Sequence, residues 1–160
     1  MVMSDTERRE RIASIKDLPA KLEGLVSGLS EEQLDRHAGG EGWSIRQVVH
    51  HLADAHLNAF LRTKLILTES KPILKPFDQE AWAELPDTTA LPMEPSLQMV
   101  KGIHARWSVL LESLPESSWE KAGVHLENGL MTLDDILKTY AGHGQTHLDQ
   151  IGRIKAGLGE

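Results

Sequence analysis

The stretch of sequence that decides the fold is residues 132–156, TLDDILKTYAGHGQTHLDQIGRIKA. Thr132 with Asp135 three residues later is a capping pattern that begins a helix, and Gly157 is typical of its end. A helix with one apolar face must pack that face against others, so the stretch predicts an all-α protein. Counted at roughly 100° per residue, the apolar face collects Leu133, Ile136, Leu137, Tyr140, His143, Gly144, His147, Leu148, Ile151 and Ile154.

Two further helices are expected upstream, in the first half of the chain. The first runs over residues 5–29 and should be kinked or split at Pro19, because proline cannot donate a helical hydrogen bond. Ser44 caps the second, with Gln47 three residues later completing a capping box, and its apolar spacing continues to about Thr68. Both helices present an apolar stripe for packing.

A long connection rich in proline separates the second and third principal helices. Prolines at 72, 76, 86, 92 and 95 exclude a long helix across 70–95, although a short turn is expected at 79–85. Pro95 suits the first turn of the third helix, and Pro115 stops it. The sequence therefore predicts a four-helix bundle whose long connection permits a departure from simple up-and-down order. No stretch shows the alternating pattern of a strand.

Composition limits the class of protein. A chain of 160 residues fits one domain, here residues 1–160, and without cysteine any transition-metal site must use imidazole and carboxylate. The net charge is −7 and the basic residues are scattered, so nucleic acid is not an expected partner. Residues 1–10 lack the apolar core of a signal peptide, and no apolar run could span a membrane. We expect a cytoplasmic protein with no membrane partner.

His143 and His147 form the most informative polar pair. They lie one helical turn apart, about 6 Å along the axis, on the apolar face of the last helix, so their side chains could converge on one ion. Each could instead be an ordinary core histidine, and the pair alone does not decide between these interpretations. Gly144 stands where the zincin motif has its glutamate base, which argues against a peptidase.

A third histidine ligand could come from the helix that begins after Ser44. Helical periodicity places His56 near the centre of the apolar face and His51 on its flank, and it does not choose between them. His50 is expected to face solvent. His51 shares its flanking row with Arg62, and this row could line a groove. Three histidines on two helices could hold a divalent metal with open positions, as catalytic sites do.

Other residues are weaker candidates for the site. Arg62 and Arg106 could hold carboxylates by paired hydrogen bonds, although either could be a surface charge. Tyr140, one turn before His143, could orient a ligand or substrate, or could be a core tyrosine. His104 could support a ligand or contact substrate, or could be a partly buried polar residue. His125 is expected in a polar loop at the end of the bundle.

Two motifs carry a resemblance to a known family: residues 43–56, WSIRQVVHHLADAH, and residues 143–147, HGQTH. With these motifs the chain resembles the DinB/YfiT-like superfamily. More narrowly, it is similar to the YfiT branch, a group of metal-dependent hydrolases that includes bacillithiol S-transferases. The likeness covers almost the whole chain and takes in residues 82–85, 104–107 and 125–129, although Leu126 stands where the family pattern has proline.

The resemblance implies a four-helix bundle with a metal site of three histidines. One ligand comes from the second principal helix and two from the last, which carried over gives His51, His143 and His147. It also implies that the metal is nickel or zinc. The resemblance therefore chooses His51 over His56, a choice that periodicity leaves open.

The leading functional hypothesis is thiol S-transfer. An ion held by three neutral imidazoles keeps its positive charge and can lower the pKa of a bound thiol or water. A low-molecular-weight thiol, similar to bacillithiol, would then attack an electrophilic small molecule, as in detoxification. Metal-dependent hydrolysis at the same site is the first alternative, and a metal- or ligand-binding bundle without turnover is the second. The expected partners are the thiol and the electrophile. The sequence does not determine the oligomeric state, and a homodimer is one alternative.

Overall fold

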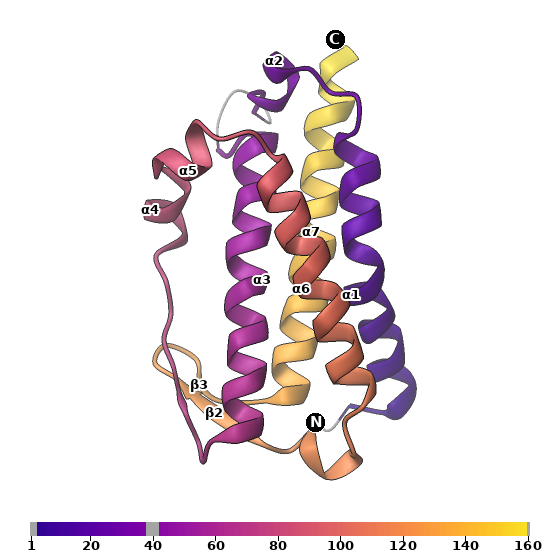
Figure 1. Ribbon diagram of the computed structural model, residues 1–160, viewed down its shortest axis with the longest axis vertical. Helices are drawn as coiled ribbons and strands as arrows, with labels where there is room; N and C mark the ends of the chain where they lie inside the picture. The colour runs from indigo at the N-terminus through magenta and orange to yellow at the C-terminus, as the bar shows by residue number, and fades with distance from the viewer. Residues whose placement is uncertain (1–2, 38–41, 160) are drawn as a thin grey trace.

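Four long helices form the body of the protein (Figure 1). The computed structural model describes residues 3–37 and 42–159. Helices α1 and α3 each pack against both α6 and α7, so neighbours around the bundle follow the order α1, α7, α3, α6. Figure 1 shows α1 and α7 running in one direction and α3 and α6 in the other. The bounds of these helices are α1, Asp5–Val26; α3, Ile45–Thr68; α6, Glu94–Glu112; and α7, Leu133–Ala156.

The long connection between α3 and α6 returns along the outside of the bundle. Because α3 and α6 run in the same direction, the chain must travel back over the length of α3 before α6 begins (Figure 1). On the way it forms β1 (Ile73–Leu74), α4 (Gln79–Ala83) and α5 (Pro86–Thr89), and both short helices pack against α3. The predicted departure from up-and-down order is confirmed, and α4 lies within the predicted turn at 79–85.

A small sheet at one end of the bundle was not expected from the sequence. β2 (Ala122–His125) and β3 (Gly129–Thr132) form an antiparallel hairpin, and β1 adds to β2 in parallel. These strands have two to four residues, which is too short for an alternating pattern to be recognised. A Cβ at Gly123 would lie 2.9 Å from the carbonyl oxygen of Pro72, so glycine is needed where β1 meets β2.

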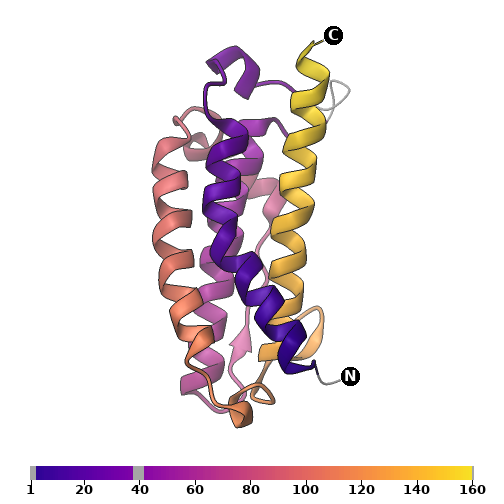
Figure 2. The same cartoon turned by 90° about the vertical axis from the view of Figure 1, so that its right-hand side faces the viewer.

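The predicted helix starts are confirmed where a capping box marks them. The Ser44 hydroxyl accepts from the backbone N–H of Gln47, and the Gln47 side chain accepts from the backbone N–H of Ser44. Thr132 and Asp135 make the same reciprocal pair at α7. Of the two alternatives expected at Pro19, a kink and a split, the structure has the first: α1 bends there and continues without interruption (Figure 2).

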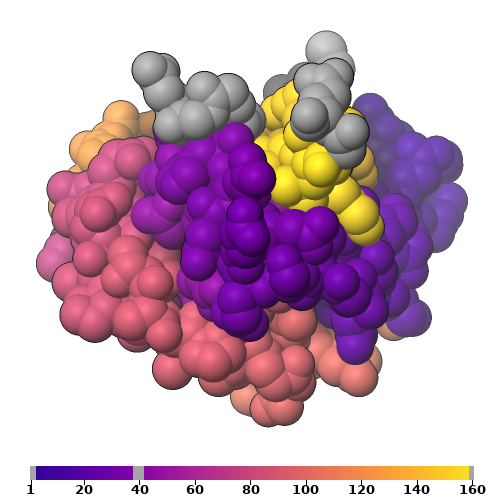
Figure 3. Space-filling model, turned by 90° about the horizontal axis from the view of Figure 1, so that it is seen from above, coloured from indigo at the N-terminus to yellow at the C-terminus, as the bar shows by residue number. Residues whose placement is uncertain are grey.

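The opposite end of the bundle is covered by the segment around α2 (Glu31–Leu34). Figure 3 shows this segment and the start of α3 between the end of α7 and the connection that carries α4 and α5. Buried Arg46 joins the parts: its Nε donates to Asp35 at 2.7 Å, and its Nη1 donates to the carbonyl of Leu91 at 3.3 Å. A short 3-10 helix, η2 (Glu116–Ser118), follows α6, and another, η3 (Gly157–Gly159), follows α7.

The apolar core consists of two clusters with a polar level between them. On α7 the cluster nearer the sheet ends at Ala141, and the other begins at Leu148. On α6 the cluster nearer the sheet includes Ile103, and the other cluster includes Val100. Histidine side chains from α3, α6 and α7 occupy the level between the clusters. Among the described residues, no helix combines the length and apolar character that crossing a membrane requires.

Candidate metal centre

The structure brings together the three histidines that the resemblance implies as ligands. His51 Nε2, on α3, lies 3.0 Å from His143 Nε2, on α7. His147 Nε2, one turn along α7, lies 3.1 Å from the same atom. One ring nitrogen from each residue falls within 4.8 Å of the other two. Two packed helices therefore present three imidazole nitrogens to a common point.

The chemistry of these nitrogens fits a divalent metal. His147 Nδ1 lies 2.8 Å from Gln150 Oε1, which can only accept, so the Nδ1 carries the proton and Nε2 is bare. Where two such nitrogens are both bare, they repel one another unless a cation lies between them. Bonds of about 2.1 Å at tetrahedral angles put ligand nitrogens roughly 3.4 Å apart, which is near the 3.0 Å and 3.1 Å that separate His143 Nε2 from the other two nitrogens. Zinc, nickel, copper and iron all suit imidazole.

Burial keeps the three rings in the form that binds metal. Burial, with the neighbouring rings of His143 and His147, lowers the pKa of His51 to about 3. Burial and the ring of His147 lower the pKa of His143 to about 4, and burial also lowers the pKa of His147. At neutral pH all three imidazoles are therefore uncharged, and no proton competes with a metal ion.

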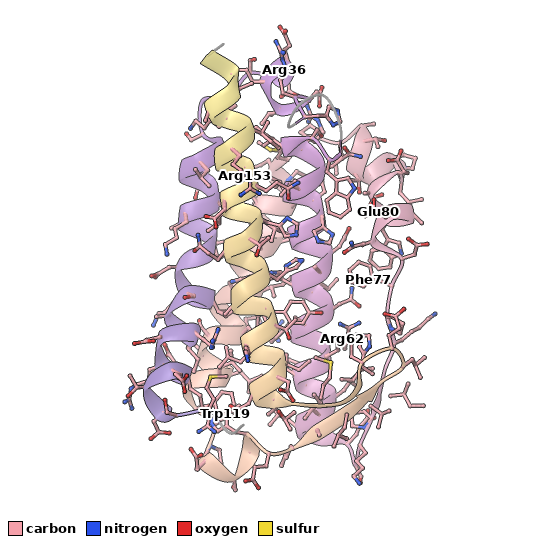
Figure 4. All side chains as sticks on the ribbon, turned by 180° about the vertical axis from the view of Figure 1, so that it is seen from behind. Arg36, Arg62, Phe77, Glu80, Trp119 and Arg153 are labelled. Carbon is pink, nitrogen blue, oxygen red and sulfur yellow. The ribbon has the colours of Figure 1, made fainter. Side chains whose placement is uncertain are left out.

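Aromatic side chains from outside the two helices line the group. The Trp43 ring lies 4.5 Å from the His51 ring and stacks at 6.2 Å on that of His147. Phe77, from the long connection, lies 6.5 Å from the His51 ring and packs against Trp82 at 4.7 Å. Figure 4 shows Phe77 and Glu80 on the connection that flanks α3. Because Trp43 donates to Glu80 at 3.0 Å, the aromatic side chain before α3 is joined to the long connection.

Arg62 and Tyr140 form a second polar group beside the histidines. Arg62 Nη1 donates to the Tyr140 hydroxyl at 2.6 Å, and its Nη2 donates to the Lys75 carbonyl at 2.6 Å. The Tyr140 ring lies 5.9 Å from that of His143. Arg62 is buried, and within residues 3–37 and 42–159 no carboxylate oxygen lies within 4.0 Å of it. A buried guanidinium without an anionic partner can bind an incoming carboxylate.

Two of the predicted site residues, Arg106 and His104, make no direct contact with the three clustered histidines. Arg106 is on the exposed side of α6, over the Phe60 ring at 5.3 Å, so the structure does not bring it to the histidines. His104 is fully buried, which leaves no surface for a substrate. It contacts His56, whose other ring nitrogen lies 3.2 Å from His143 Nδ1. His56 therefore stands behind the metal-binding group.

Two histidines that were expected to face solvent or to lie in a loop, His50 and His125, are buried. His50 lies against Ser96 Oγ at 2.7 Å and the Leu91 carbonyl at 3.1 Å, because the end of the connection covers that side of α3. A helical wheel of α3 alone cannot show this covering segment. His125 is part of β2 and not of a loop, and its Nδ1 accepts from the backbone N–H groups of Glu127 and Asn128.

Sequence reasoning missed three residues that shape the group. Gln150 fixes the proton of His147, and Trp43 and Phe77 form the aromatic wall. The signal for Gln150 was available, since it lies three residues after His147 on the same helix. Phe77 gave no signal, because it lies in an irregular segment whose path is set by the fold.

Comparison with known proteins places the chain in a family. A sequence model of the DinB superfamily matches residues 14–151. The chain belongs to the DinB superfamily. Curated DinB relatives bear the name "Putative metal-dependent hydrolase". One from Geobacillus thermodenitrificans (strain NG80-2) is 44% identical over 149 residues, covering 92% of this chain and 83% of the relative. One from Geobacillus kaustophilus (strain HTA426) is 46% identical over 151 residues, covering 93% and 84%.

A solved structure agrees with this assignment, and a second shares the fold. YfiT from Bacillus subtilis, described as "a probable metal-dependent hydrolase with an unusual four-helix bundle topology", superposes with a TM-score of 0.94 at 34% identity. The match covers 99% of this chain and 91% of YfiT, so the predicted four-helix bundle and YfiT-like character are confirmed. The mycothiol-dependent maleylpyruvate isomerase shares the fold, with a TM-score of 0.72 at 14% identity over 91% of this chain and 60% of that one. The relatives' names and the three-histidine group together support metal dependence in this DinB protein.

Proposed function

We propose that this DinB-superfamily protein is a metal-dependent thiol S-transferase. The observation that carries the proposal is the group formed by His51, His143 and His147, which among the described residues contains no carboxylate. When bound there, zinc or nickel would lower the pKa of a thiol or water beside it. A thiol has an ordinary pKa near 8.5, so it needs little further activation. Metal-assisted hydrolysis would more often use a neighbouring carboxylate as base.

The reaction joins a low-molecular-weight thiol to an electrophilic carbon. The thiol gives its proton to solvent, its sulfur forms a C–S bond, and the leaving group departs with the electrons of the bond that breaks. His51, His143 and His147 hold the metal, and Trp43 and Phe77 provide an apolar wall on which an electrophile can lie.

Arg62 is proposed to hold a carboxylate of the thiol. Its guanidinium is buried and is positioned by hydrogen bonds to the Tyr140 hydroxyl and the Lys75 carbonyl. A carboxylate would satisfy its charge through paired hydrogen bonds. The thiol substrates are therefore expected to be acidic, with the carboxylate separated from the sulfur by the distance between Arg62 and the histidines.

An assay with the zinc- or nickel-loaded protein tests the transferase. We expect conjugation of monobromobimane to a panel of thiols above the rate without enzyme, and loss of that excess in His51→Ala. Arg62→Leu should raise KM for thiols that carry a carboxylate and leave KM for 2-mercaptoethanol unchanged. Absence of any rate above background with every thiol would remove the transferase proposal. An equal KM change for both kinds of thiol would remove the role of Arg62.

Hydrolysis is the second candidate, because the relatives' names favour it. The same metal-loaded protein would then cleave esters or amides with no thiol present, and added thiol would not increase the rate. Metal bound at the three histidines with neither activity would instead indicate a binding protein without turnover. Metal content by mass spectrometry identifies the ion in each case.

A further inference from the structure

A continuous chain of hydrogen bonds leads from the metal-binding group to the far side of the bundle. His143 Nδ1 lies 3.2 Å from His56 Nε2, and His56 Nδ1 lies 2.9 Å from His104 Nε2. His104 Nδ1 lies 2.5 Å from the backbone carbonyl oxygen of Ile15. The contacts pass from α7 through α3 and α6 to α1. His56 and His104 are each 0% exposed, so water does not supply alternative partners.

The Ile15 carbonyl is available because of a proline one turn later. In a regular helix this carbonyl would accept the N–H of residue 19, but residue 19 is Pro19, which has none. The sequence predicted a kink or a split at this point, and α1 bends there without a split. His104 supplies the donor that the helix lacks. The irregularity in α1 and the buried histidine on α6 therefore satisfy one another.

The carbonyl fixes the direction of every hydrogen bond in the chain. A carbonyl oxygen can only accept, so His104 carries its proton on Nδ1. A buried uncharged imidazole has one N–H, so His104 Nε2 accepts and His56 Nδ1 must donate to it. By the same step His56 Nε2 accepts, and His143 Nδ1 donates. His143 Nε2 is left bare, and this is the nitrogen that faces His51 and His147.

We propose that the Ile15 carbonyl, His104 and His56 are positioning groups that hold His143 in the tautomer required for metal binding. The inference rests on the proposed metal site. The surrounding side chains hold the rings in place: His104 stacks on His56 at 4.9 Å, and Tyr140 meets the His56 ring edge-on at 5.6 Å. Partners of this kind orient a ligand ring and raise its basicity. The periodicity that suggested His56 as a ligand reflects this role behind the ligand.

The tautomers themselves can be measured without metal or substrate. Long-range ¹H–¹⁵N correlation spectra of the metal-free protein, with assigned histidine side chains, distinguish a protonated Nδ1 from a protonated Nε2. We expect the Nδ1–H form for His143, His56 and His104. A protonated Nε2 on any of the three would overturn the proposal. This measurement is independent of the proposed function, since a protein that binds no metal would defeat that function and still report the tautomers.

Two substitutions of His104 separate positioning from packing. Glutamine can donate to the Ile15 carbonyl and accept from His56, whereas leucine can do neither. We expect zinc affinity, measured by competition with a chromophoric chelator, to fall about tenfold to a hundredfold in His104→Leu and to stay near the wild-type value in His104→Gln. His56 should lose its single Nδ1–H form in His104→Leu only.

A neighbouring apolar substitution provides the control. Ile103→Ala opens a cavity on the same helix and removes none of the hydrogen bonds of the chain, so it should lower stability and leave zinc affinity unchanged. Equal affinities for His104→Leu and His104→Gln, or the same loss in Ile103→Ala, would overturn the proposal. Should His104→Leu fail to fold, the tautomers of the wild-type and His104→Gln proteins still decide it.

Discussion

At the scale of single residues, the site depends on which ring nitrogen of each histidine carries the proton. His143 and His147 share a helix face, but their protons are fixed by different partners. Gln150 accepts from His147 within α7, whereas the partner of His143 lies on α3. The first partner is local and readable from spacing. The second requires the helices to be packed.

Gln150 provides a direct test of the local partner. Gln150→Leu removes the acceptor of His147 Nδ1, so that ring can place its proton on the metal-facing nitrogen. We expect zinc affinity to fall about tenfold, measured by chelator competition. Gln145→Leu is the matched control, because within residues 3–37 and 42–159 its exposed side chain bonds only to Asp149, on the same helix. Equal affinities in the two variants would contradict the role given to Gln150.

At the scale of elements, α7 is the helix that carries two of the three clustered histidines. Its capping box and its face were predictable because they depend on local spacing. The short strands were not predictable, and neither was the choice between a kink and a split at Pro19, because contacts with other segments decide them. Gly144 lies on the predicted apolar face, but only the packed structure shows that it makes room for Leu18 of α1 and for His56.

Gly144 offers a test of the packing between α7 and α1. A Cβ at this position would lie 2.6 Å from Leu18 Cδ1, so the helices or the side chain must shift. Gly144→Ala should lower the free energy of unfolding by about 1–3 kcal/mol, measured by urea denaturation. At Gly142, on the same helix, nothing lies within 4 Å of such a Cβ. Gly142→Ala should therefore raise stability by up to about 1 kcal/mol, and a loss similar to that of Gly144→Ala would refute the explanation.

At the scale of the whole molecule, buried charge joins the beginning of the chain to its last helix. Arg8 Nε donates to Asp134 at 2.7 Å, and Arg8 Nη1 reaches Glu116 at 2.7 Å. Arg8 and Asp134 are 126 residues apart, so only the tertiary structure shows the pair.

The pair of Arg8 with Asp134 should contribute more to the free energy of unfolding than the contact of Arg8 with exposed Asp5. Asp134→Ala leaves Arg8 buried with exposed carboxylates only and should cost about 3 kcal/mol of unfolding free energy. Asp5, whose side chain is 71% exposed, also contacts Arg8, at 3.4 Å. Asp5→Ala should cost less than about 1 kcal/mol. Thermal and urea denaturation of both variants measure the difference, and equal costs would argue against a buried pair.

The buried histidines predict how stability depends on pH. Burial lowers the pKa of His51 to about 3 and that of His143 to about 4, from 6.5 in an unfolded chain. Between pH 6.5 and pH 4 the unfolded chain therefore binds protons that the folded protein excludes, and stability falls as pH falls. The slope is about 1.4 kcal/mol per pH unit for each such histidine. Urea denaturation of metal-free protein from pH 7.5 to about 5 would measure it.

One carboxyl group opposes this trend. Burial and nearby Asp87 raise the pKa of Asp54 to about 6, so its protonation favours the folded state over the same range. Asp54→Asn should therefore make the loss of stability in acid steeper. A metal-free protein whose stability is flat or rises on going from pH 6.5 to about 5 would show that the histidines are not buried in their neutral form.

The sequence alone determined the four helices, the capping boxes at Ser44 and Thr132 and the shared face of His143 and His147, because these depend on spacing along one helix. Helical periodicity could not choose between His51 and His56, since both lie on the side of α3 that faces the bundle. The tertiary structure separates them: α7 packs beside α3 so that His51 reaches His143 Nε2, which also lies beside His147, and His56 reaches His143 Nδ1. The link to α1 also required the complete fold, because it joins a carbonyl left free by Pro19 to a side chain on α6.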